Sequence, residues 1–508
     1  MRIFLYILFS SYIGLSYTQG YFFSDHLGRY NFDKKIYSSE NRHSGIKPYL
    51  VLRQDTLIRQ KGIWGYANNL DSVKFKLLPV VGFNLKENPQ FQSEQDFYSA
   101  SKIGAQFNAS ISEKIATQVR YSYNSGQLSS FIDTNVVKRP YAPGLGMLSD
   151  SSERIYSLGE LDGYISYSPN KYFVLSTGVG KHFFGDGYRS LLLSDFAPTY
   201  PFFKMESTFW KVKYVNLWSA HKDYNHPLIT KNKFSSSHIL SWNVSKWLNL
   251  SVFESVVWQG KDSLNNRGFD INYMNPFVFF RPVEYSIGSA DNSFFGGSLK
   301  VTISEKHVFY GQLLLDEFLL SEWRNNNNWW GNKFAFQVGY RSFDLFGIKG
   351  FHFLSEYNFI RPYTYSHLTS LQNYGHLNQS LAHPLESNIR EFLSRIGYQK
   401  NNLDVLIQYN FQEFGLDFQN NNFGGNMFSG YDSRDGDYGQ EITQGKKVKQ
   451  HLINTRISYM LMPLTNTKFF IEYIYKHSQQ GQGFNTSLTY SVISFGLSSN
   501  LWDSYQDY

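Results

Sequence analysis

Three segments of the chain hold the side chains whose types and spacing could carry chemistry. Each segment mixes aromatic rings with arginine, histidine or carboxylate groups over a short run. The segments are residues 180–195, residues 273–292 and residues 361–367, the last followed by 374–376 and 382–385. The candidate ligand-binding residues within them are Asp186, Tyr188, Arg189, Asp195, Arg281, Glu284, Tyr285, Asp291, Arg361, Tyr363, Tyr365 and His367.

Two interpretations fit these residues. In the first, Arg189 pairs with Asp186 or Asp195, and Arg281 pairs with Glu284 or Asp291, in a partly desolvated interior where bidentate arginine pairing is effective. In the second, the residues form a carbohydrate surface on which aromatic faces stack against sugar rings while Arg, Asp and Asn bind hydroxyl groups. The aromatic platforms would be Tyr188, Tyr285, Tyr363, Tyr365, Trp329 and Trp330. The residues alone leave both interpretations open.

Signatures of catalysis or cofactor binding do not accompany these segments. The run Gly178 to Lys181 lacks the Ser or Thr and the spacing of a phosphate-binding loop. The sequence contains no HExxH, CxxC or GxSxG pattern, and its 13 His residues are dispersed. We therefore expect no catalytic residue, no cofactor and no metal, and a non-enzymatic protein.

Two alternatives to this expectation are a hydrolase and a calcium site. A hydrolase would need Ser366 with His367, or Ser380 with His383, to meet an acid. Adjacent residues on a strand point to opposite faces, which disfavours the first pair. The acidic run 432–441 offers oxygen ligands for calcium, but its Gly436 is misplaced for an EF-hand loop, so a solvated acidic loop is the favoured interpretation.

The elements that must position these side chains are strands. Apolar side chains recur at every second residue, as in Ile115, Thr117, Val119, Tyr121 and Tyr123 against Gln118, Arg120, Ser122 and Asn124. The same alternation appears at residues 73–86, 403–412 and 468–476. One face suits lipid and the other suits a wet lumen.

About sixteen to eighteen such segments occur, each about ten residues long, which is the length that a tilted strand needs to cross a bilayer. An open sheet edge in hydrocarbon would leave unpaired N–H and C=O groups. The sequence therefore predicts an all-β fold, a single transmembrane antiparallel up-and-down β-barrel over residues 71–508, whose first and last strands pair.

The connections between the strands alternate in length. Short candidates are 113–114, 169–171, 246–247 and 401–402. Long candidates are 126–157, 223–236, 261–275 and 417–447, and we expect these on the cell exterior. Near the end of the chain, Phe495, Leu497, Leu501 and Trp502 resemble a closing-strand signal for the barrel-assembly machinery, although Ser499 departs from the expected aromatic residue.

Composition supports a membrane barrel. The chain has 18% aromatic and 18% charged residues and 39 Gly, and ordinary globular domains carry about 25% charged residues. A membrane barrel has an apolar outer face and aromatic girdles, which explains the low charged fraction and the high aromatic fraction. A secreted β-sandwich array is the alternative. The formal net charge of +7 is scattered, so we expect no nucleic-acid partner. The absence of cysteine excludes disulfides and thiol catalysis.

The start of the chain predicts export. Arg2 precedes an apolar run from Ile3 to Ser16 and a small-x-small pattern, which indicates a signal peptide over residues 1–20. A single membrane anchor is the alternative, but the run is shorter than the ~20 residues of a spanning helix. No later run is long enough, so a helical membrane protein is excluded. Residues 21–70 lack alternation, and the sequence leaves open a periplasmic extension, a short helical piece or a lumen-filling arm.

The runs HFFGDGYRSLLLSD, NPFVFFRPVEYSIGSADN and RPYTYSH, with AHPL further on, resemble the Wzi-type capsule-assembly proteins. They resemble more closely the RemB-type proteins associated with gliding motility. The resemblance extends loosely from about Gly159 to the end of the chain. It implies an outer-membrane barrel that binds or organises surface polysaccharide, for capsule attachment or in support of gliding, and it carries over no catalytic residue.

The sequence thus predicts a cell outer membrane protein of a Gram-negative bacterium. Its expected partners are outer-membrane lipid, surface polysaccharide and, during biogenesis, the barrel-assembly machinery. Motility or secretion components are possible further partners that the sequence does not identify. A porin or substrate-specific channel is the alternative function.

Overall fold

The computed structural model describes most of the chain. The described residues are 19–22, 30–38, 43–52, 64–67, 73–87, 97–111, 114–127, 141–142, 144, 146–147, 155–226, 229–261, 267–276, 291–463, 465–481, 486–499 and 507. Most of the predicted signal peptide lies outside these residues, as do Arg281, Glu284 and Tyr285. Among the described residues, no helix has the length and apolar character needed to cross a bilayer.

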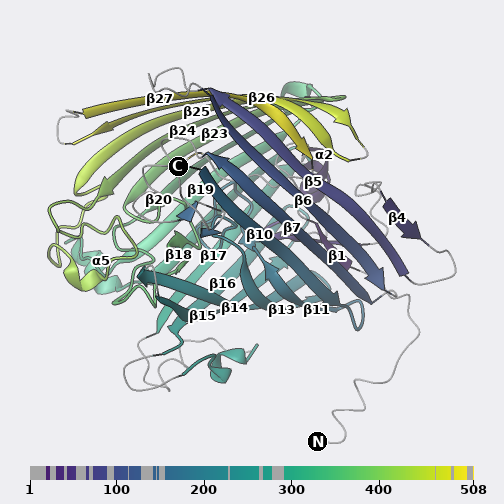
Figure 1. Ribbon diagram of the computed structural model, residues 1–508. Helices are drawn as coiled ribbons and strands as arrows, with labels where there is room; N and C mark the ends of the chain where they lie inside the picture. Colours follow the sequence, from purple (N-terminus) through teal and green to yellow (C-terminus); the bar gives the residue numbers. More distant parts are fainter. Residues whose placement is uncertain are drawn as a thin grey trace, which may run out of the picture.

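A single antiparallel sheet closes on itself to form a barrel of 18 long strands within the described part of the chain (Figure 1). The strands are β5 (Val73–Glu87), β6 (Phe97–Ile111), β7 (Ile115–Gln127), β10 (Ile155–Tyr167), β11 (Phe173–Gly180), β13 (Tyr200–Phe209), β14 (Val212–His226), β15 (Ile229–Asn243), β16 (Leu248–Gln259), β17 (Asn292–Ser304), β18 (His307–Glu317), β19 (Lys333–Phe343), β20 (Phe351–Ile360), β23 (Ile389–Lys400), β24 (Leu403–Leu416), β25 (Lys446–Met462), β26 (Thr467–Gln480) and β27 (Thr486–Ser499). This confirms the predicted fold, at the upper end of the expected strand number.

The last strand closes the barrel on the first. β27 pairs with β5 from Ile493 opposite Glu87 to Ser499 opposite Val81, and the short β4 (Trp64–Ala67) pairs with the remaining edge of β5. Each strand therefore has a hydrogen-bonded neighbour on both sides, which satisfies the backbone groups that lipid cannot. Phe495 and Leu497 in the closing strand point outward and are exposed, as the sequence predicts.

The outer face of the wall is apolar, and the inner face carries most of the polar and charged side chains of the strands. Tyr121, Ile165, Leu313 and Ile471 are about half exposed on the outside, whereas Arg120, the neighbour of Tyr121, is buried on the inside. Exposed apolar side chains on a ring of strands with no open edge are stable only in lipid. This wall places the protein in an outer membrane.

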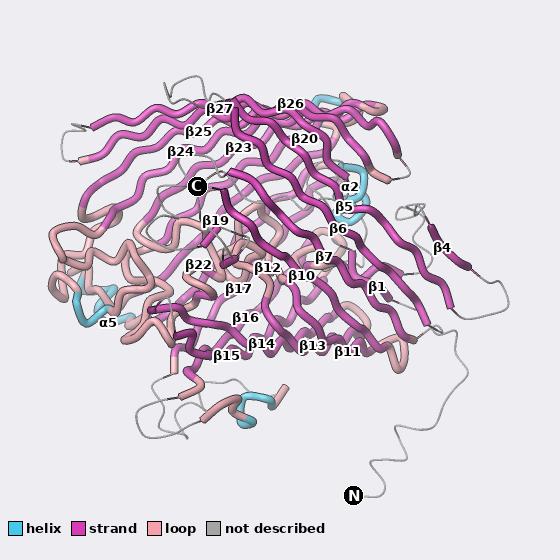
Figure 2. The backbone as a smooth tube through the Cα atoms, in the orientation of Figure 1, coloured by secondary structure: helices cyan, strands magenta, loops and turns pink. Residues whose placement is uncertain are grey.

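Connections alternate between tight turns at one end of the barrel and long segments at the other (Figure 2). The four predicted short turns lie between strands, as do the long connections 128–154, 260–291 and 417–445. The long-loop end faces the exterior by the general rule for such barrels. The predicted loop 223–236 is wrong, because β14 continues to His226 and β15 begins at Ile229. Two of its polar residues, Asp223 and Lys233, are buried on the inner face of these strands and bond to residues 370–373.

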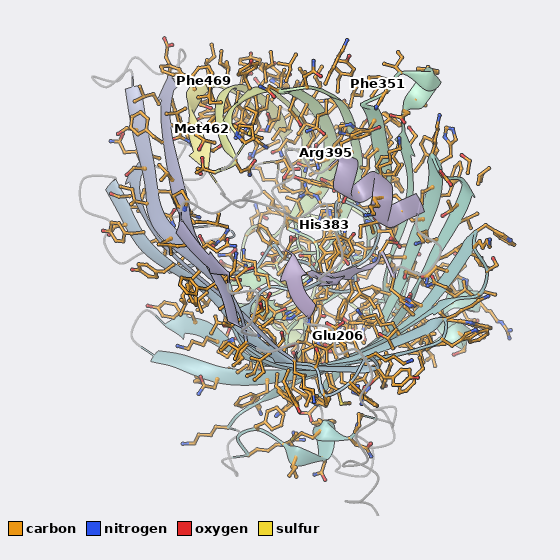
Figure 3. The ribbon with its side chains drawn as sticks, turned by 90° about the vertical axis from the view of Figure 1, so that its right-hand side faces the viewer. Glu206, Phe351, His383, Arg395, Met462 and Phe469 are labelled. Carbon is orange, nitrogen blue, oxygen red and sulfur yellow. The ribbon has the colours of Figure 1, made fainter. Side chains whose placement is uncertain are left out.

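Two of the long connections fold into the lumen. Residues 181–199 include β12 (Phe183–Phe184), and residues 361–388 include β21 (Gly375–His376) and β22 (Gln379–Ser380). Leu191, Leu192, Leu193, Tyr365 and Tyr374 from these connections form one apolar core with inward residues of β13 to β20. We call these two connections the luminal plug. Figure 3, a view along the barrel, shows His383 of the plug within the ring of strands.

The segment before β4 also contacts the inner side of the barrel. Helix α2 (Tyr30–Ser38) stacks Tyr30 on His352 at 5.2 Å between ring centroids, and Asp33 pairs with Arg341 at 2.9 Å. β2 (Ile46–Lys47) pairs with β12 of the plug. The described residues 30–38 and 43–49, whose place the sequence left open, thus lie against luminal side chains. The remaining short strands are β1 (Gln19–Phe22), β3 (Tyr49–Leu52), β8 (Tyr141–Ala142) and β9 (Gly146–Met147).

The pairing of β27 with β5 leaves no room for a side chain at Gly496, and this can be tested. A Cβ atom at this position would lie 1.9 Å from the Phe83 carbonyl oxygen and 2.9 Å from the Asn84 Cα atom. Because both obstacles are backbone atoms of the partner strand, Gly496→Val should push the strands apart and cost about 3 kcal/mol or more. We expect a lower folded fraction on refolding into detergent micelles, measured by heat-dependent gel mobility.

The control is Ser498→Val, which enlarges a residue on the same face of β27 that already carries a Cβ atom. Equal folding of the two variants would contradict this account of the pairing between β27 and β5.

Candidate functional site

Arg189 is the centre of a buried ionic network in the luminal plug. Its guanidinium donates from Nε and Nη2 to the two carboxylate oxygens of Glu391 at 3.2 and 3.0 Å, and from Nη1 to Asp507 Oδ1 at 3.2 Å. Side chains of Arg189 and Glu391 are fully buried. Burial alone lowers the pKa of Arg189, but Asp507 and Glu391 more than offset it, so its pKa lies well above the usual value. The cation is permanent.

The barrel wall satisfies the rest of this network. Glu356 accepts hydrogen bonds from the backbone N–H groups of Tyr188 and Arg189, both at 2.9 Å. Gly187 makes this approach possible, because a Cβ atom there would lie 2.7 Å from Glu356 Oε2. His383 of the second plug connection bonds Glu391 through Nε2 at 2.7 Å. The arrangement joins both plug connections to the inner wall.

The predicted ion-pair partners of Arg189 are wrong. Asp186 accepts instead from Ser44 Oγ at 2.6 Å, and its backbone carbonyl accepts from Arg341 Nη2 at 3.0 Å. Asp195 is half-buried beside the cavity described below. The true partners, Glu391 and Asp507, lie 202 and 318 residues from Arg189 along the chain. No local spacing could reveal them.

The tyrosines of the third candidate segment are buried structural residues. Tyr365 donates from its hydroxyl to the Leu191 carbonyl and Tyr374 donates to the Leu192 carbonyl, both at 2.8 Å. Tyr363 donates to the Asn422 carbonyl at 2.9 Å. Because Tyr363 and Tyr365 are at most 1% exposed, neither offers a face to a sugar, and the platform interpretation fails for both.

The other candidates in this segment and the second segment also have internal partners. Arg361 donates to the Gln440 carbonyl at 3.3 Å, and His367 Nδ1 lies 3.0 Å from Gln372 Oε1. Asp291 pairs with Arg267 at 2.7 Å, where the sequence suggested Arg281, which lies outside the described residues together with Glu284 and Tyr285.

A small cavity adjoins the plug near Tyr188. It has a volume of about 80 Å³ and is lined in part by Tyr188, Asp195, Arg341 and Arg395. The Arg395 guanidinium lies over the Tyr188 ring at 4.3 Å from its centroid. Ligand pockets have volumes of about 300–1,000 Å³, so this cavity admits a few water molecules and not a sugar ring.

An exposed polar and aromatic surface lies instead at the long-loop end. It is formed by residues 318–332, which include α5 (Leu320–Asn325), and by the connection 417–445, which includes η5 (Tyr431–Ser433). We call this surface the exterior platform. Backbone hydrogen bonds from Trp330 N to Asp437 O and from Gly439 N to Asn327 O join its two halves. In Figure 1 these loops and α5 lie together at the left end of the barrel.

Trp330 is the structural centre of the exterior platform. Its ring lies 4.8 Å from Tyr431, and the Arg434 guanidinium lies 4.2 Å above it. Arg434 also pairs with Asp437 at 2.7 Å. Trp329 and Trp330 are half-buried, so the predicted aromatic platforms are present here in part. In the acidic run considered for calcium, Arg434 is the positive charge that pairs with Asp432 and Asp437.

Around this centre, exposed side chains present rings, amides and carboxylates to the outside. They are Trp323, Asn325, Asn326, Asn328, Asp432, Asp435, Asp437, Tyr438 and Glu441. Trp323 and Tyr438 are 50% and 57% exposed. Sequence reasoning missed Trp323, Tyr438 and the asparagine run, although their position in long exterior connections was a usable signal.

The serine and histidine pairs considered for hydrolysis are engaged elsewhere. Ser366 donates to the Tyr363 carbonyl at 2.6 Å, and Ser380 Oγ accepts from the Ala382 N–H at 3.0 Å. His383 uses Nε2 toward Glu391 and accepts from the Leu385 N–H at Nδ1. Both ring nitrogens of His383 are therefore occupied within the plug.

The Arg189 network predicts a large stability effect. Arg189→Met leaves the buried carboxylates of Glu391 and Asp507 without their cation, which should lower the free energy of unfolding by about 3–5 kcal/mol. The matched control, Arg434→Met, removes a partly exposed pair and should cost under about 1 kcal/mol. Denaturant titration in micelles measures both. Similar losses for the two variants would show that the plug does not depend on Arg189.

Comparison with known proteins identifies the fold. The barrel is similar to Wzi of Escherichia coli, an outer membrane carbohydrate-binding β-barrel involved in group 1 capsule assembly, with 13% identity over 85% of each chain and a TM-score of 0.50. It is also similar to OccAB2 of Acinetobacter baumannii (11% identity, 85% of this chain and 98% of that chain, TM-score 0.45) and to OpdK of Pseudomonas aeruginosa (10%, 84% and 98%, 0.44). No protein-family model and no curated protein sequence matches the chain. The likeness to Wzi is one of fold, and membership of the RemB-type group stays a prediction.

Proposed function

We propose that this protein is a non-enzymatic outer-membrane receptor that holds cell-surface polysaccharide on its exterior platform, while the plug keeps the lumen from acting as a channel. The observation that carries the proposal is the exposure of Trp323 and Tyr438 among three asparagines on connections that are hydrogen-bonded to each other. Aromatic faces bind the apolar faces of sugar rings, and amides bind hydroxyl groups as donor and acceptor.

Rigidity of the platform supports this proposal. Trp330 is fixed between Tyr431 and Arg434, and the two connections share backbone hydrogen bonds. A surface that is already ordered loses little conformational entropy on binding, which favours affinity for a ligand with few apolar groups.

Charge on the platform favours a class of sugar. Asp432, Asp435, Asp437 and Glu441 are exposed, and they outnumber the two arginines of the platform, the exposed Arg324 and Arg434, which pairs with Asp437. A uronate-rich chain would meet like charge here, whereas a neutral or amine-bearing chain would not. The ligand we propose is therefore a neutral or amino-sugar polysaccharide, held for surface attachment or for traction in gliding.

The contents of the lumen support a binding role over a transport role. The core around Leu191, Leu192 and Leu193 joins the plug to the inner face of β13 to β20, and the buried Arg189 pairs hold it from the other side. A transport path through this region would require the separation of buried ions.

Tyr438→Ala tests the platform. Tyr438 is exposed, so its removal should leave the fold intact and weaken glycan binding about tenfold. The control is Tyr459→Ala, which removes a similarly exposed tyrosine from the lipid-facing wall. Binding to an array of neutral, amino and acidic polysaccharides measures both. Unchanged binding by Tyr438→Ala would refute the platform as the binding surface, and binding restricted to acidic glycans would refute the proposed class of sugar.

Planar-bilayer recording separates the receptor from a channel. The plugged barrel should show no steady conductance at protein densities where an open porin in the same bilayer gives regular steps. Steady conductance by the native chain would favour the channel alternative.

A further inference from the structure

One described segment lies on the outside of the barrel wall. Residues 267–276 belong to the connection between β16 and β17 and contain the 3-10 helix η3 (Ile271–Met274). We call this segment the outer flap. In Figure 1 it lies below β14 and β16, and in Figure 3, which views the barrel along its axis, it lies outside the ring of strands.

Outward-facing wall residues hold the flap in place. The Tyr273 carbonyl accepts hydrogen bonds from Trp218 Nε1 of β14 and Ser236 Oγ of β15, both at 2.9 Å. Trp258 of β16 donates from Nε1 to the Gly268 carbonyl at 3.2 Å and packs its ring 4.8 Å from Tyr273. Contacts to three neighbouring strands fix the flap against the wall.

The charged groups of the flap are paired with one another. Arg267 pairs with Asp270 and Asp291, each at 2.7 Å, and the Tyr273 hydroxyl donates to Asp291 at 2.7 Å. Asp270, Tyr273 and Asp291 are all at most 9% exposed. These internal pairs leave the outward edge of the flap free of unpaired charge.

That outward edge is apolar. Ile271 is 74% exposed, and Phe269 and Met274 are each 40% exposed. In water, such exposure forgoes about 25 cal/mol for each Å² of apolar surface that could be buried. The exposed polar residues of this edge are Asn272, between Ile271 and Met274, and Asn275, directly after Met274. Large apolar side chains on one face of a segment are what such a segment buries at the boundary between headgroups and acyl chains.

The apolar edge is continuous with a surface already assigned to lipid. Phe203, which stacks on Trp218 at 5.5 Å, is 39% exposed on the outer wall, and Leu240, Val252 and Phe295 on β15 to β17 are 40 to 46% exposed. We propose that the outer flap is a lateral anchor that inserts Phe269, Ile271 and Met274 into the outer leaflet beside strands β14 to β16. This role is independent of glycan binding on the exterior platform.

The absence of native cysteine allows a direct test. Ile271→Cys is labelled with an environment-sensitive fluorophore, and the full-length protein is reconstituted into phosphatidylcholine vesicles. Quenching is measured with nitroxide-labelled lipid and, separately, with iodide in the water. Leu240→Cys on the lipid-facing wall and Asp432→Cys on the exterior platform, labelled alike, are the two reference positions.

We expect the label at Ile271→Cys to lose most of its fluorescence to the nitroxide lipid and little to iodide, as at Leu240→Cys. Quenching by iodide to the extent seen at Asp432→Cys would place the flap in water and overturn the proposal. Protection from both quenchers would also overturn it, because a protein surface would then cover the flap. All three positions are exposed, so labelling leaves the core and the plug unchanged.

Discussion

The requirement that every backbone N–H and C=O group in hydrocarbon has a partner governs this structure. A helix meets the requirement within its own segment, whereas a strand meets it only through neighbours on both sides. The pairing of β27 with β5 is therefore the contact on which the other 17 strand pairings depend, because it removes the last open edge. Closure also divides the side chains into an outer set selected for lipid and an inner set that must find partners in a confined lumen.

The lumen of a barrel this wide has to be either hydrated or filled, and here two connections fold into it and contact wall strands from β13 to β23. Apolar residues of the plug bury one another against β13 to β20, and the remaining polar atoms are satisfied by wall residues such as Glu356 and Glu391. The buried ions cost desolvation energy, which only dense pairing offsets. Such pairing fixes a single position for the plug, because each charge has its partners on different elements.

The long connections at one end of the barrel reach three different environments. Residues 181–199 and 361–388 turn inward, residues 318–332 and 417–445 remain at the exterior rim, and residues 267–276 fold back over the outer wall. Their side chains differ accordingly: buried tyrosines in the plug, amides and carboxylates on the platform, and apolar tips on the flap. One scaffold thereby offers separate surfaces to solvent and to lipid.

The sequence by itself determined the strands, their faces, most of the turns and the closed barrel, because alternation is a local property that each strand carries in its own residues. It failed at residues 223–236, where Lys233 resembles a loop residue but lies on a strand and donates to plug carbonyl groups at Ser370 and Asn373. The sequence identified Tyr188, Arg189 and Tyr365 as candidate functional residues, but it did not predict which residues they contact. Only the tertiary structure decided that Arg189 meets Glu391 and Asp507, and which aromatic rings remain exposed, because these contacts join segments hundreds of residues apart whose approach depends on the closed wall.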